Sequence, residues 1–543
     1  MQKGCLAMLE NKKKIRTNSS GFPVWAGYLF TAIVCVGITL LLTSGPDEIG
    51  KASYGTGVYD TGDTIRPGYG TGVYDTGDTG KAAGGTTSHG SGGMKKETGN
   101  TSPHDGGDTG KGAGGSVPYE AGETTLSSGI MPGGAYAVRD IIDEKGRITF
   151  MDNWFMDTRV KFAMDGIWHR MGNVNEILDT AGRIRHTSEL SWYREWYKTA
   201  ERIRSIGDEC LEKGHRISAG EAYLRASNYY LTAEVMLHTN PDDQRIEETY
   251  RKGGEYFVKA LELLSIPASE VWIPYEDSKI KGYLFKAEAG ENAPILLVHQ
   301  GYDAPIESTK YIAEEAVRRG YHCLLFEGPG QGMTIRSQNI PLRPDWENVV
   351  SAVIDYALTV PGVDEENVML MGISMGGGFA VRAAAFEPRL KLCIVNPGYV
   401  NIYDIIKNYL TPELINLYEE DPLELNKKIE EIAGYEVGIR WGIYHGMWVF
   451  GADTPSEFLD NVRKFDYTDI VGRIRCRMLV MDGTSEQWGK GQARELYEML
   501  DCEKEYMLFT DEDSASEHCQ VGAGAIATQR MFDWLDENLE RLG

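Results

Sequence analysis

A serine between two glycines is the residue of this 543-residue chain best suited to nucleophilic chemistry. The stretch Gly372-Ile373-Ser374-Met375-Gly376 follows the apolar run 367–370 and leads into 379–385, which is typical of a helix. A serine at a tight turn between a strand and a helix leaves no room for side chains two positions before and after it. This accounts for Gly372 and Gly376. The pattern predicts a nucleophile elbow that exposes the Ser374 hydroxyl at a helix N-terminus. The alternative is an ordinary turn in a chain that holds 64 glycines.

A general base for this serine is expected later in the chain, because an elbow of this type uses its partners in the order serine, acid, histidine. Only His445 and His518 follow Ser374. His518 lies in a polar loop between the last predicted strand and the closing helix, whereas His445 lies in a predicted helical stretch. The topology therefore predicts His518 as the base, against the alternative of a surface loop histidine.

The acid that orients the histidine is expected after the predicted strand 477–481, where Asp482 and Glu486 compete. Asp482 ends the strand directly. Glu486 follows Gly483-Thr484-Ser485, at the spacing at which such folds usually carry the acid. A glutamate can orient an imidazole as an aspartate does, with one more methylene to accommodate. We predict Glu486, and Asp482 is the alternative.

Two backbone N–H groups should face the negative charge that develops on the substrate carbonyl. Met375, the residue after the nucleophile, is expected to supply one of them. Tyr302 is expected to supply the other, because His299-Gln300-Gly301-Tyr302-Asp303 follows an earlier strand. The next strand leads into Glu327-Gly328-Pro329-Gly330-Gln331-Gly332, which either borders the pocket or is a structural turn.

These residues need a sheet to position them, and the chain from 269 onward alternates short apolar runs with amphipathic stretches. That alternation predicts an α/β class with a mostly parallel sheet, which opens with an antiparallel pair, 271–275 and 281–286. The other predicted strands are 294–299, 321–326, 367–371, 390–396, 477–481 and 505–510. The predicted helices are 309–319, 346–358, 375–386, 492–500 and 522–542.

Helical sequence interrupts the sheet between 397 and 465 and predicts a lid over the strand ends. Helices are expected at 402–410, 412–420 and 423–433. The aromatic stretch that follows them should wall an apolar pocket and exclude water. The predicted substrate-binding residues are Trp441, Tyr444, His445 and Trp448.

A second, all-helical domain is expected before the sheet, over 134–268. Its many aromatic side chains recur at helical spacing among mixed charges. Residues of these types at such spacing are usually packed in an interior.

The amino terminus carries the signals of a membrane anchor. Residues 24–43 form a nearly unbroken apolar run of bilayer length, preceded by a basic tail, 1–23, and followed by acidic residues. The positive-inside bias predicts a single-pass protein with a cytoplasmic N-terminus and an extracytoplasmic catalytic part. A cleaved signal peptide is the alternative. Eight cysteines without evident pairing are more typical of a cytosolic protein, which stands in tension with this localisation.

Residues 44–133 are rich in glycine, threonine and aspartate, and the ten residues 55–64 recur unchanged at 70–79. Such a segment buries too little apolar surface to offset its chain entropy, so it is expected to be a disordered linker. The net charge of -25 argues against a nucleic-acid partner. The scattered cysteines show no zinc-type pairs, so we expect no metal.

From about residue 150 the chain resembles the α/β-hydrolases that pair an N-terminal helical domain with the hydrolase core. This group includes 2,6-dihydroxypseudooxynicotine hydrolase, the fungal yellowish-green pigment hydrolases that shorten polyketides, and FrsA-like esterases. The resemblance is carried by Gly301-Tyr302-Asp303, Gly328-Pro329-Gly330-Gln331-Gly332, Gly372-Ile373-Ser374-Met375-Gly376-Gly377, the stretch 441–451, Gly491-Gln492-Ala493 and His518-Cys519-Gln520.

The resemblance implies the α/β-hydrolase fold and hydrolysis of an ester, or of a C–C bond beside a ketone, without metal or organic cofactor. Glu486 departs from it, because the family usually has aspartate there. The anchor and the repeats are not part of the family pattern.

The sequence thus predicts a membrane-tethered serine hydrolase that acts on a small-molecule carbonyl substrate. Residues 24–43 are expected to contact the lipid bilayer, and a homodimer is a further possibility. The rival interpretations are a serine peptidase of the acylaminoacyl or dipeptidyl type, and a non-catalytic anchored binding protein on a hydrolase scaffold. The predicted segments are 1–23, tail; 24–43, anchor; 44–133, linker; 134–268, helical domain; 269–396, first part of the core; 397–465, lid; and 466–543, second part of the core.

Overall fold

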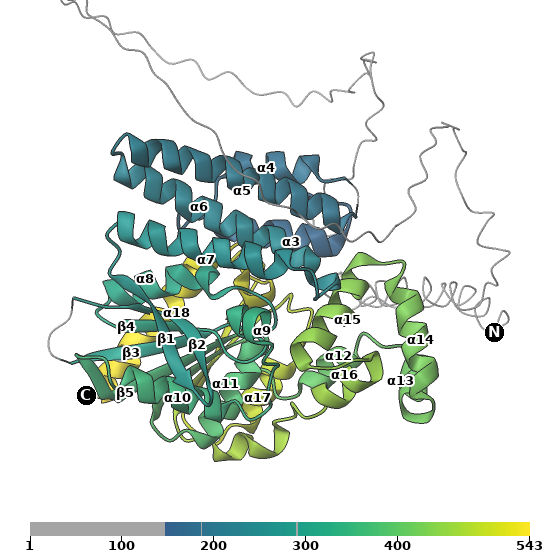
Figure 1. Cartoon of the computed structure of the whole chain (residues 1–543). Coiled ribbons are helices and arrows are strands. Elements are labelled where there is room, and N and C mark those ends of the chain that lie inside the picture. The colour runs from purple at the N-terminus through teal and green to yellow at the C-terminus, as the bar shows by residue number, and fades with distance from the viewer. Residues whose placement is uncertain (1–146, 186, 289–291, 543) are drawn as a thin grey trace, which may run out of the picture. The chain divides into compact units, whose positions relative to one another are not determined.

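The computed structural model describes residues 147–185, 187–288 and 292–542 (Figure 1). The predicted tail, membrane anchor and repeat linker lie outside these residues, and so does the start of the predicted helical domain. Within the described ranges, no helix is both long enough and apolar enough to cross a membrane.

The centre of the molecule is an eight-stranded sheet with the strand order β1-β2-β4-β3-β5-β6-β7-β8. The pairs β1–β2 and β2–β4 are antiparallel, and every later pair is parallel. The prediction of a mostly parallel sheet with an antiparallel opening pair is therefore confirmed. The strands are β1 (Ala268–Tyr275), β2 (Ser278–Phe285), β3 (Ala293–His299), β4 (His322–Phe326), β5 (Val363–Ile373), β6 (Leu390–Asn396), β7 (Arg477–Gly483) and β8 (Lys504–Phe509).

The strand that leads to Ser374 is longer than the apolar pattern indicated. β5 begins at Val363 rather than at 367, and the four residues after Val363 are polar and at least partly exposed. An apolar run marks only the part of a strand that is buried on both faces, so a polar start that extends beyond the core leaves no such signal.

Helices cover both faces of the sheet, and successive side chains of a strand point to opposite faces. On β3, Ile295 and Leu297 pack with one set of helices, and Leu296 and Val298 pack with the other. The first face holds α10 (Glu347–Ala357), α11 (Met375–Phe386) and α17 (Gln492–Met499), and the second holds α8 (Lys310–Arg318) and α18 (Gly524–Leu542).

The helices before the sheet form a layer beside it (Figure 1). Their own core includes Trp192, Trp196, Tyr229 and Tyr230, each fully buried, as expected for aromatics at helical spacing. Two tryptophans depart from that expectation, because Trp154 and Trp168 are nearly half exposed. The helices are α3 (Trp154–Asp165), α4 (Val174–Arg183), α5 (Glu189–Glu212), α6 (Arg216–Glu234), η3 (Val235–Thr239) and α7 (Arg245–Leu263).

The chain between β6 and β7 is helical, as predicted, and it is joined to the N-terminal helices. The Arg440 guanidinium forms an ion pair with Glu189 at 2.6 Å. The Trp441 indole N–H donates to the Val235 carbonyl at 2.6 Å. The helices of this insertion are α12 (Ile402–Lys407), α13 (Pro412–Glu420), α14 (Pro422–Ala433), α15 (Val437–Phe450), α16 (Pro455–Val462) and η5 (Thr468–Arg473).

The sequence pattern missed α16 and the short helix α9 (Gly332–Gln338), which follows β4. The seven residues of α9 begin with a glycine and include too few apolar side chains to show helical periodicity. The helix is nevertheless important, because it places the residues after β4 beside the loop that follows β3.

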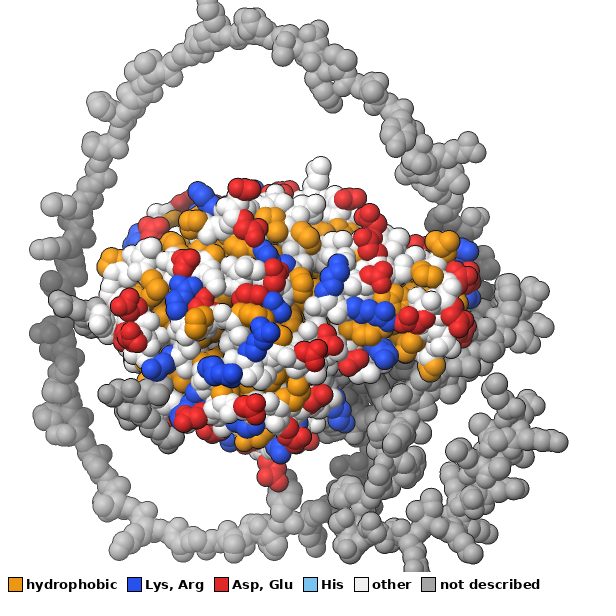
Figure 2. All heavy atoms as spheres, turned by 90° about the horizontal axis from the view of Figure 1, so that it is seen from below, with side chains coloured by type: hydrophobic (Ala, Val, Ile, Leu, Met, Phe, Trp, Pro, Cys, Tyr) orange, Lys and Arg blue, Asp and Glu red, His pale blue; other side chains and the backbone are white. Residues whose placement is uncertain are grey.

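Basic and acidic side chains alternate over the face of the molecule drawn in Figure 2. This face therefore carries no extended field of one sign that would attract a polyanion.

Candidate active site

Ser374 lies at a sharp turn between β5 and α11. Its backbone is left-handed, with φ 59° and ψ -131°, a region that residues with a side chain rarely adopt. Its N–H donates to the Asn396 carbonyl at 2.7 Å and ties the turn to the end of β6. The turn is so tight that a Cβ on Gly372 would come within 2.1 Å of the Gly376 carbonyl oxygen. This geometry is that of a nucleophile elbow.

The structure brings Ser374, His518 and Glu486 into one hydrogen-bonded chain. His518 Nε2 lies 2.9 Å from Ser374 Oγ, and His518 Nδ1 lies 2.6 Å from Glu486 Oε2. His518 begins η6 (His518–Gln520), in the loop between β8 and α18, and Glu486 follows β7. Three segments far apart in the sequence thus meet where the parallel strands end.

Glu486 is 4% exposed, and its other carboxylate oxygen is also fully engaged. Oε1 accepts hydrogen bonds from the Trp488 N–H at 2.8 Å, the Tyr399 hydroxyl at 3.1 Å and the Gly489 N–H at 3.3 Å. Burial by itself raises the pKa of this carboxyl, but His518 and these donors outweigh burial and lower the pKa below its ordinary value. Glu486 is therefore held as a carboxylate next to the imidazole.

Asp482, the alternative acid, lies in a different set of contacts. Its carboxylate accepts from the Tyr506 hydroxyl at 2.7 Å and from the Gly483 N–H at 2.8 Å. Burial raises its pKa. No hydrogen bond between Asp482 and His518 is present in the described part of the chain, so the geometry favours Glu486 as the partner of the histidine.

The electrostatics of His518 favour the protonated ring. Burial by itself would lower its pKa, but the neighbouring Cys519 sulfur and the Glu486 carboxylate raise the pKa well above the ordinary value of 6.5. The Glu486 carboxylate, at 2.6 Å from Nδ1, stabilises the imidazolium directly. The Cys519 Sγ lies 3.3 Å from His518 Nε2.

The loop after β3 lies against the N-terminus of α11. A Cβ on Gly301 would come within 2.6 Å of the Met375 nitrogen, so only a glycine permits this approach. Met375 opens α11, and the first N–H groups of a helix have no intrahelical acceptor. The Tyr302 N–H donates to no other group of the residues that the structure describes. Both backbone groups that the sequence singled out as oxyanion donors are thus close to the elbow.

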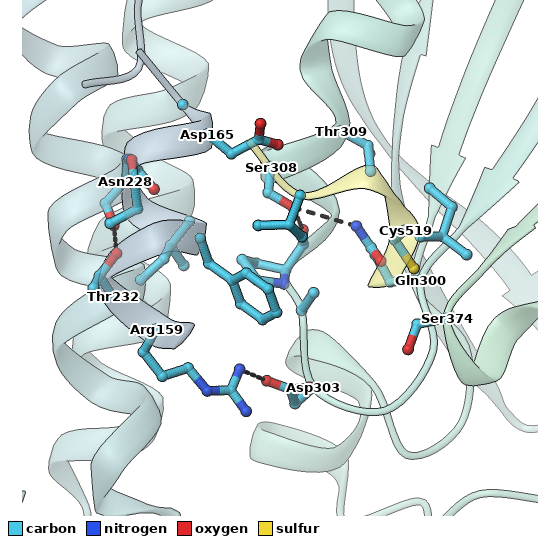
Figure 3. Close-up of a pocket in the computed structure, with 18 of the residues that line it drawn as sticks. Arg159, Asp165, Asn228, Thr232, Gln300, Asp303, Ser308, Thr309, Ser374 and Cys519 are labelled. Carbon is cyan, nitrogen blue, oxygen red and sulfur yellow. Dashed lines mark hydrogen bonds and ion pairs between the residues drawn. The ribbon is translucent and has the colours of Figure 1, made fainter. Parts of the chain in front are cut away.

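A cavity of about 170 Å³ extends from Ser374 to the N-terminal helices. Figure 3 shows Arg159, Asp165, Asn228 and Thr232 on the helical side, and Ser374 with Cys519 on the opposite side. The apolar part of the wall comes from both sides and includes Phe162, Ala163, Met171, Leu231, Val235, Ile373 and Val521. The cavity is therefore mostly apolar with a few polar groups, which is typical of a site for a small organic molecule.

A buried ion pair lies at one edge of this cavity. The Arg159 guanidinium donates to the Asp303 carboxylate, and the two side chains are only 9% and 15% exposed. The guanidinium also lies over the rings of Trp441 and Phe155, at 4.6 Å and 4.7 Å from their centroids. The pair joins α3 to the loop that contains Tyr302.

Trp441, Tyr444, His445 and Trp448, which were expected to contact substrate, are not among the residues that line the cavity. His445 and Trp441 are buried and stacked, with ring centroids 4.5 Å apart, and His445 Nε2 lies 3.2 Å from the Tyr302 carbonyl oxygen. These two side chains support the Tyr302 loop from behind. The aromatic pattern predicted a pocket wall, but it could not reveal that the Tyr302 loop lies between these two side chains and the cavity.

The polar residues on the helical side of the cavity were missed by sequence reasoning. Arg159, Asp165 and Asn228 lie on α3 and α6, and they reach the cavity only because these helices pack against the end of the sheet. No local motif marks them. Their helical spacing and polarity are those of ordinary surface residues.

No group of three or more histidine, cysteine, aspartate or glutamate side chains suited to a metal ion is present among the described residues. The described cysteines, Cys210, Cys323, Cys393, Cys476, Cys502 and Cys519, are all free thiols.

Most of the described part of the chain is similar to known proteins. Residues 168–413 match the model of the esterase FrsA-like family. Hydrolase acrC of Aspergillus aculeatus is 31% identical over 380 residues, which cover 64% of this chain and 88% of that protein. The 20-hydroxy-prefusarin hydrolase FUS2 of Gibberella moniliformis is 31% identical over 384 residues, which cover 67% and 91%.

A solved structure shows the same fold. The crystal structure of 2,6-dihydroxy-pseudo-oxynicotine hydrolase superposes with a TM-score of 0.55 at 21% sequence identity, over 68% of this chain and 94% of that one. At this identity the likeness bears on the fold alone.

Proposed function

Because the chain belongs to the FrsA-like family of α/β-hydrolases, we propose that it is a serine hydrolase that cleaves an ester, or a C–C bond beside a ketone, in a small organic substrate. The observation that carries this proposal is the hydrogen-bonded chain from Ser374 Oγ through His518 to Glu486. A hydroxyl, an imidazole and a carboxylate in this order are the parts that nucleophilic acyl transfer requires.

In the first step, His518 Nε2 accepts the Ser374 proton while Oγ attacks the substrate carbonyl. The charge that develops on the carbonyl oxygen is held by the N–H groups of Met375 and Tyr302. Glu486 accepts the Nδ1 proton in a hydrogen bond, which fixes the tautomer and stabilises the imidazolium. The protonated His518 then gives its proton to the leaving group, an alkoxide for an ester or a ketone-stabilised carbanion for a C–C bond. Water completes the cycle by hydrolysing the acyl-enzyme, with His518 again as the base.

The N-terminal helices determine the substrate in this proposal. Their residues form a whole side of the cavity, so a substrate whose carbonyl meets Ser374 must extend toward α3 and α6. The small volume favours a compact substrate, and the mostly apolar wall with Asn228, Thr232 and Asp165 favours one that carries a few hydrogen-bonding groups. The helical insertion α12–α16, which was expected to be a lid, contributes no residue to the cavity wall. It contacts the site through Tyr302, whose hydroxyl donates to the Gly442 carbonyl at 3.0 Å.

The location of the protein is a second proposal, which rests on its sequence. Residues 24–43 anchor the protein in a bilayer with the N-terminus cytoplasmic, and the hydrolase acts on the other side. Resistance of the full-length protein to alkaline extraction from membranes, and its digestion by protease added to intact cells, are the expected results. Release into the soluble fraction would contradict the anchor.

The test of the hydrolase function is covalent labelling of the full-length protein with a fluorophosphonate probe, followed by mass spectrometry of the adduct. Labelling at Ser374 is expected, and it should disappear in both Ser374→Ala and His518→Ala. A folded protein that is never labelled would favour the binding-protein alternative. Turnover of blocked peptides but not of acyl esters or β-diketones would favour the peptidase alternative.

A further inference from the structure

The turn after β4 reaches across to the loop after β3 through a single side chain. Gln331, which is only 5% exposed, directs its amide toward two successive peptide groups of that loop. Its Nε2 donates to the Gln300 carbonyl at 2.5 Å and to the Gly301 carbonyl at 2.9 Å. Its Oε1 accepts from the Gly328 N–H at 2.9 Å. All the hydrogen-bonding groups of this amide are thus used to join two backbone segments.

The Gly301 carbonyl belongs to the same peptide unit as the Tyr302 N–H. A trans peptide is planar, so its C=O and N–H point in opposite directions. A donor that holds the carbonyl therefore also sets the direction of the N–H. A hydrogen bond to the carbonyl oxygen also polarises the peptide and strengthens its N–H as a donor.

We propose that Gln331 is the residue that positions and polarises the oxyanion-binding peptide of this enzyme. It acts through the Tyr302 N–H and does not touch substrate, since it is not among the residues that line the cavity. The inference rests on the proposed function and deepens it, because it assigns a role to the Gly328-Pro329-Gly330-Gln331-Gly332 turn.

The role predicts an effect on the tetrahedral state and little effect on the ground state. In Gln331→Met the side chain keeps its length but loses its donors, so the peptide that carries the Tyr302 N–H loses the hydrogen bond that sets its direction. Loss of a complete oxyanion donor lowers kcat by about 10²–10³-fold, and a misdirected donor should cost about 10–100-fold. The KM for an aryl acetate should change by less than about threefold, because the ground-state carbonyl gains little from this donor.

The experiment uses the full-length protein with p-nitrophenyl acetate as substrate and an aryl trifluoromethyl ketone as reversible inhibitor. The inhibitor forms a tetrahedral adduct with a serine hydroxyl and so reports on oxyanion binding. In Gln331→Met we expect kcat to fall and the inhibition constant to rise by similar factors, while KM stays near the wild-type value.

Gln338→Met is the matched control, because Gln338 ends α9, the helix that directly follows Gln331, and its Nε2 also donates to a backbone carbonyl, that of Lys279, at 2.9 Å. Gln338 does not line the cavity. This variant should match the wild type in kcat and in inhibition constant.

Gln331→Glu provides a readout that a purely structural role would not produce. The introduced carboxyl group can still accept from the Gly328 N–H, but it can donate to the Gly301 carbonyl only when protonated. The ratio of variant to wild-type kcat should therefore increase as pH falls through the pKa of that carboxyl group. This measurement also remains informative if Gln331→Met does not fold.

The outcomes separate the two proposals. Two results with an active wild-type protein would overturn the role of Gln331 and leave the hydrolase function intact. One is an unchanged kcat and inhibition constant in folded Gln331→Met. The other is a pH-independent ratio of Gln331→Glu to wild-type kcat. A wild-type protein that neither turns over the ester nor reacts with the fluorophosphonate probe would overturn both.

Discussion

Asp165, the last residue of α3, accepts a hydrogen bond at 3.1 Å from the backbone N–H of Gly522, four residues after His518. The N-terminal helical layer is thus attached directly to the loop that carries the general base. The same aspartate lines the cavity. Burial raises its pKa to about 6, against the lowering effect of the backbone donors Gly522 and Gly524.

This carboxyl group gives a first prediction about stability. Its pKa is higher in the folded than in the unfolded protein, so its contribution to stability is present below about pH 4 and is lost as pH rises to about 6. Asp165→Asn keeps an acceptor for Gly522 but removes this titration. In the wild type the melting temperature should fall between pH 4 and 6, which corresponds to a loss of at most about 3 kcal/mol in the free energy of unfolding. In the variant this fall should be absent. Parallel pH curves for the two proteins would contradict the prediction.

The second prediction concerns the pH dependence of the reaction. Catalysis requires neutral His518, and Glu486 raises the pKa of the imidazole. Activity should therefore be lost as pH falls, with the acid limb of kcat/KM at a pH above the ordinary histidine value of 6.5. The measurement is a pH profile with an aryl ester. In Glu486→Gln the residual activity should have its acid limb at lower pH, because the carboxylate no longer stabilises the imidazolium.

The third prediction separates the two candidate acids. Glu486→Gln should lower kcat by about 10³–10⁴-fold, because an amide cannot hold the imidazole in the tautomer that the reaction needs. Asp482→Asn is the matched change four residues earlier, and it should retain activity while it loses about 1 kcal/mol of stability from its weakened bond to Tyr506. The reverse order of the two effects on kcat would identify Asp482 as the acid.

The fourth prediction tests whether the helical layer selects the substrate. Phe162→Ala enlarges the cavity on the side of α3, so kcat/KM should increase for bulky acyl esters relative to acetyl esters. The control is Phe386→Ala. Arg382 lies 4.1 Å from the Phe386 ring centroid, as Arg159 lies 5.3 Å from that of Phe162, but Phe386 is outside the cavity. If both variants changed selectivity equally, or if neither changed it, the result would argue against a pocket formed by the helices.

The sequence by itself predicted the sheet, and it proposed Ser374, Glu486 and His518 as the groups that meet at its edge, with Asp482 as the alternative acid. Each of the eight strands was predicted from an apolar run, and the signal is clearest where a strand is buried on both faces, as in β4 and the end of β5. Ser374 was marked by the glycines that its turn requires, and Glu486 and His518 by their places after particular strands. Such signals are local, or follow from the order of elements in a known kind of fold.

Only the tertiary structure decided which other residues reach the cavity. Arg159 and Asn228 lie on helices whose placement depends on packing between segments far apart in the sequence, and no local pattern encodes that placement. For the same reason Trp441 and His445 were expected at the cavity but pack behind Tyr302 instead. The contact of Gln331 with the Gly301 carbonyl likewise joins two loops 30 residues apart, so it follows from how β3 and β4 lie side by side in the sheet.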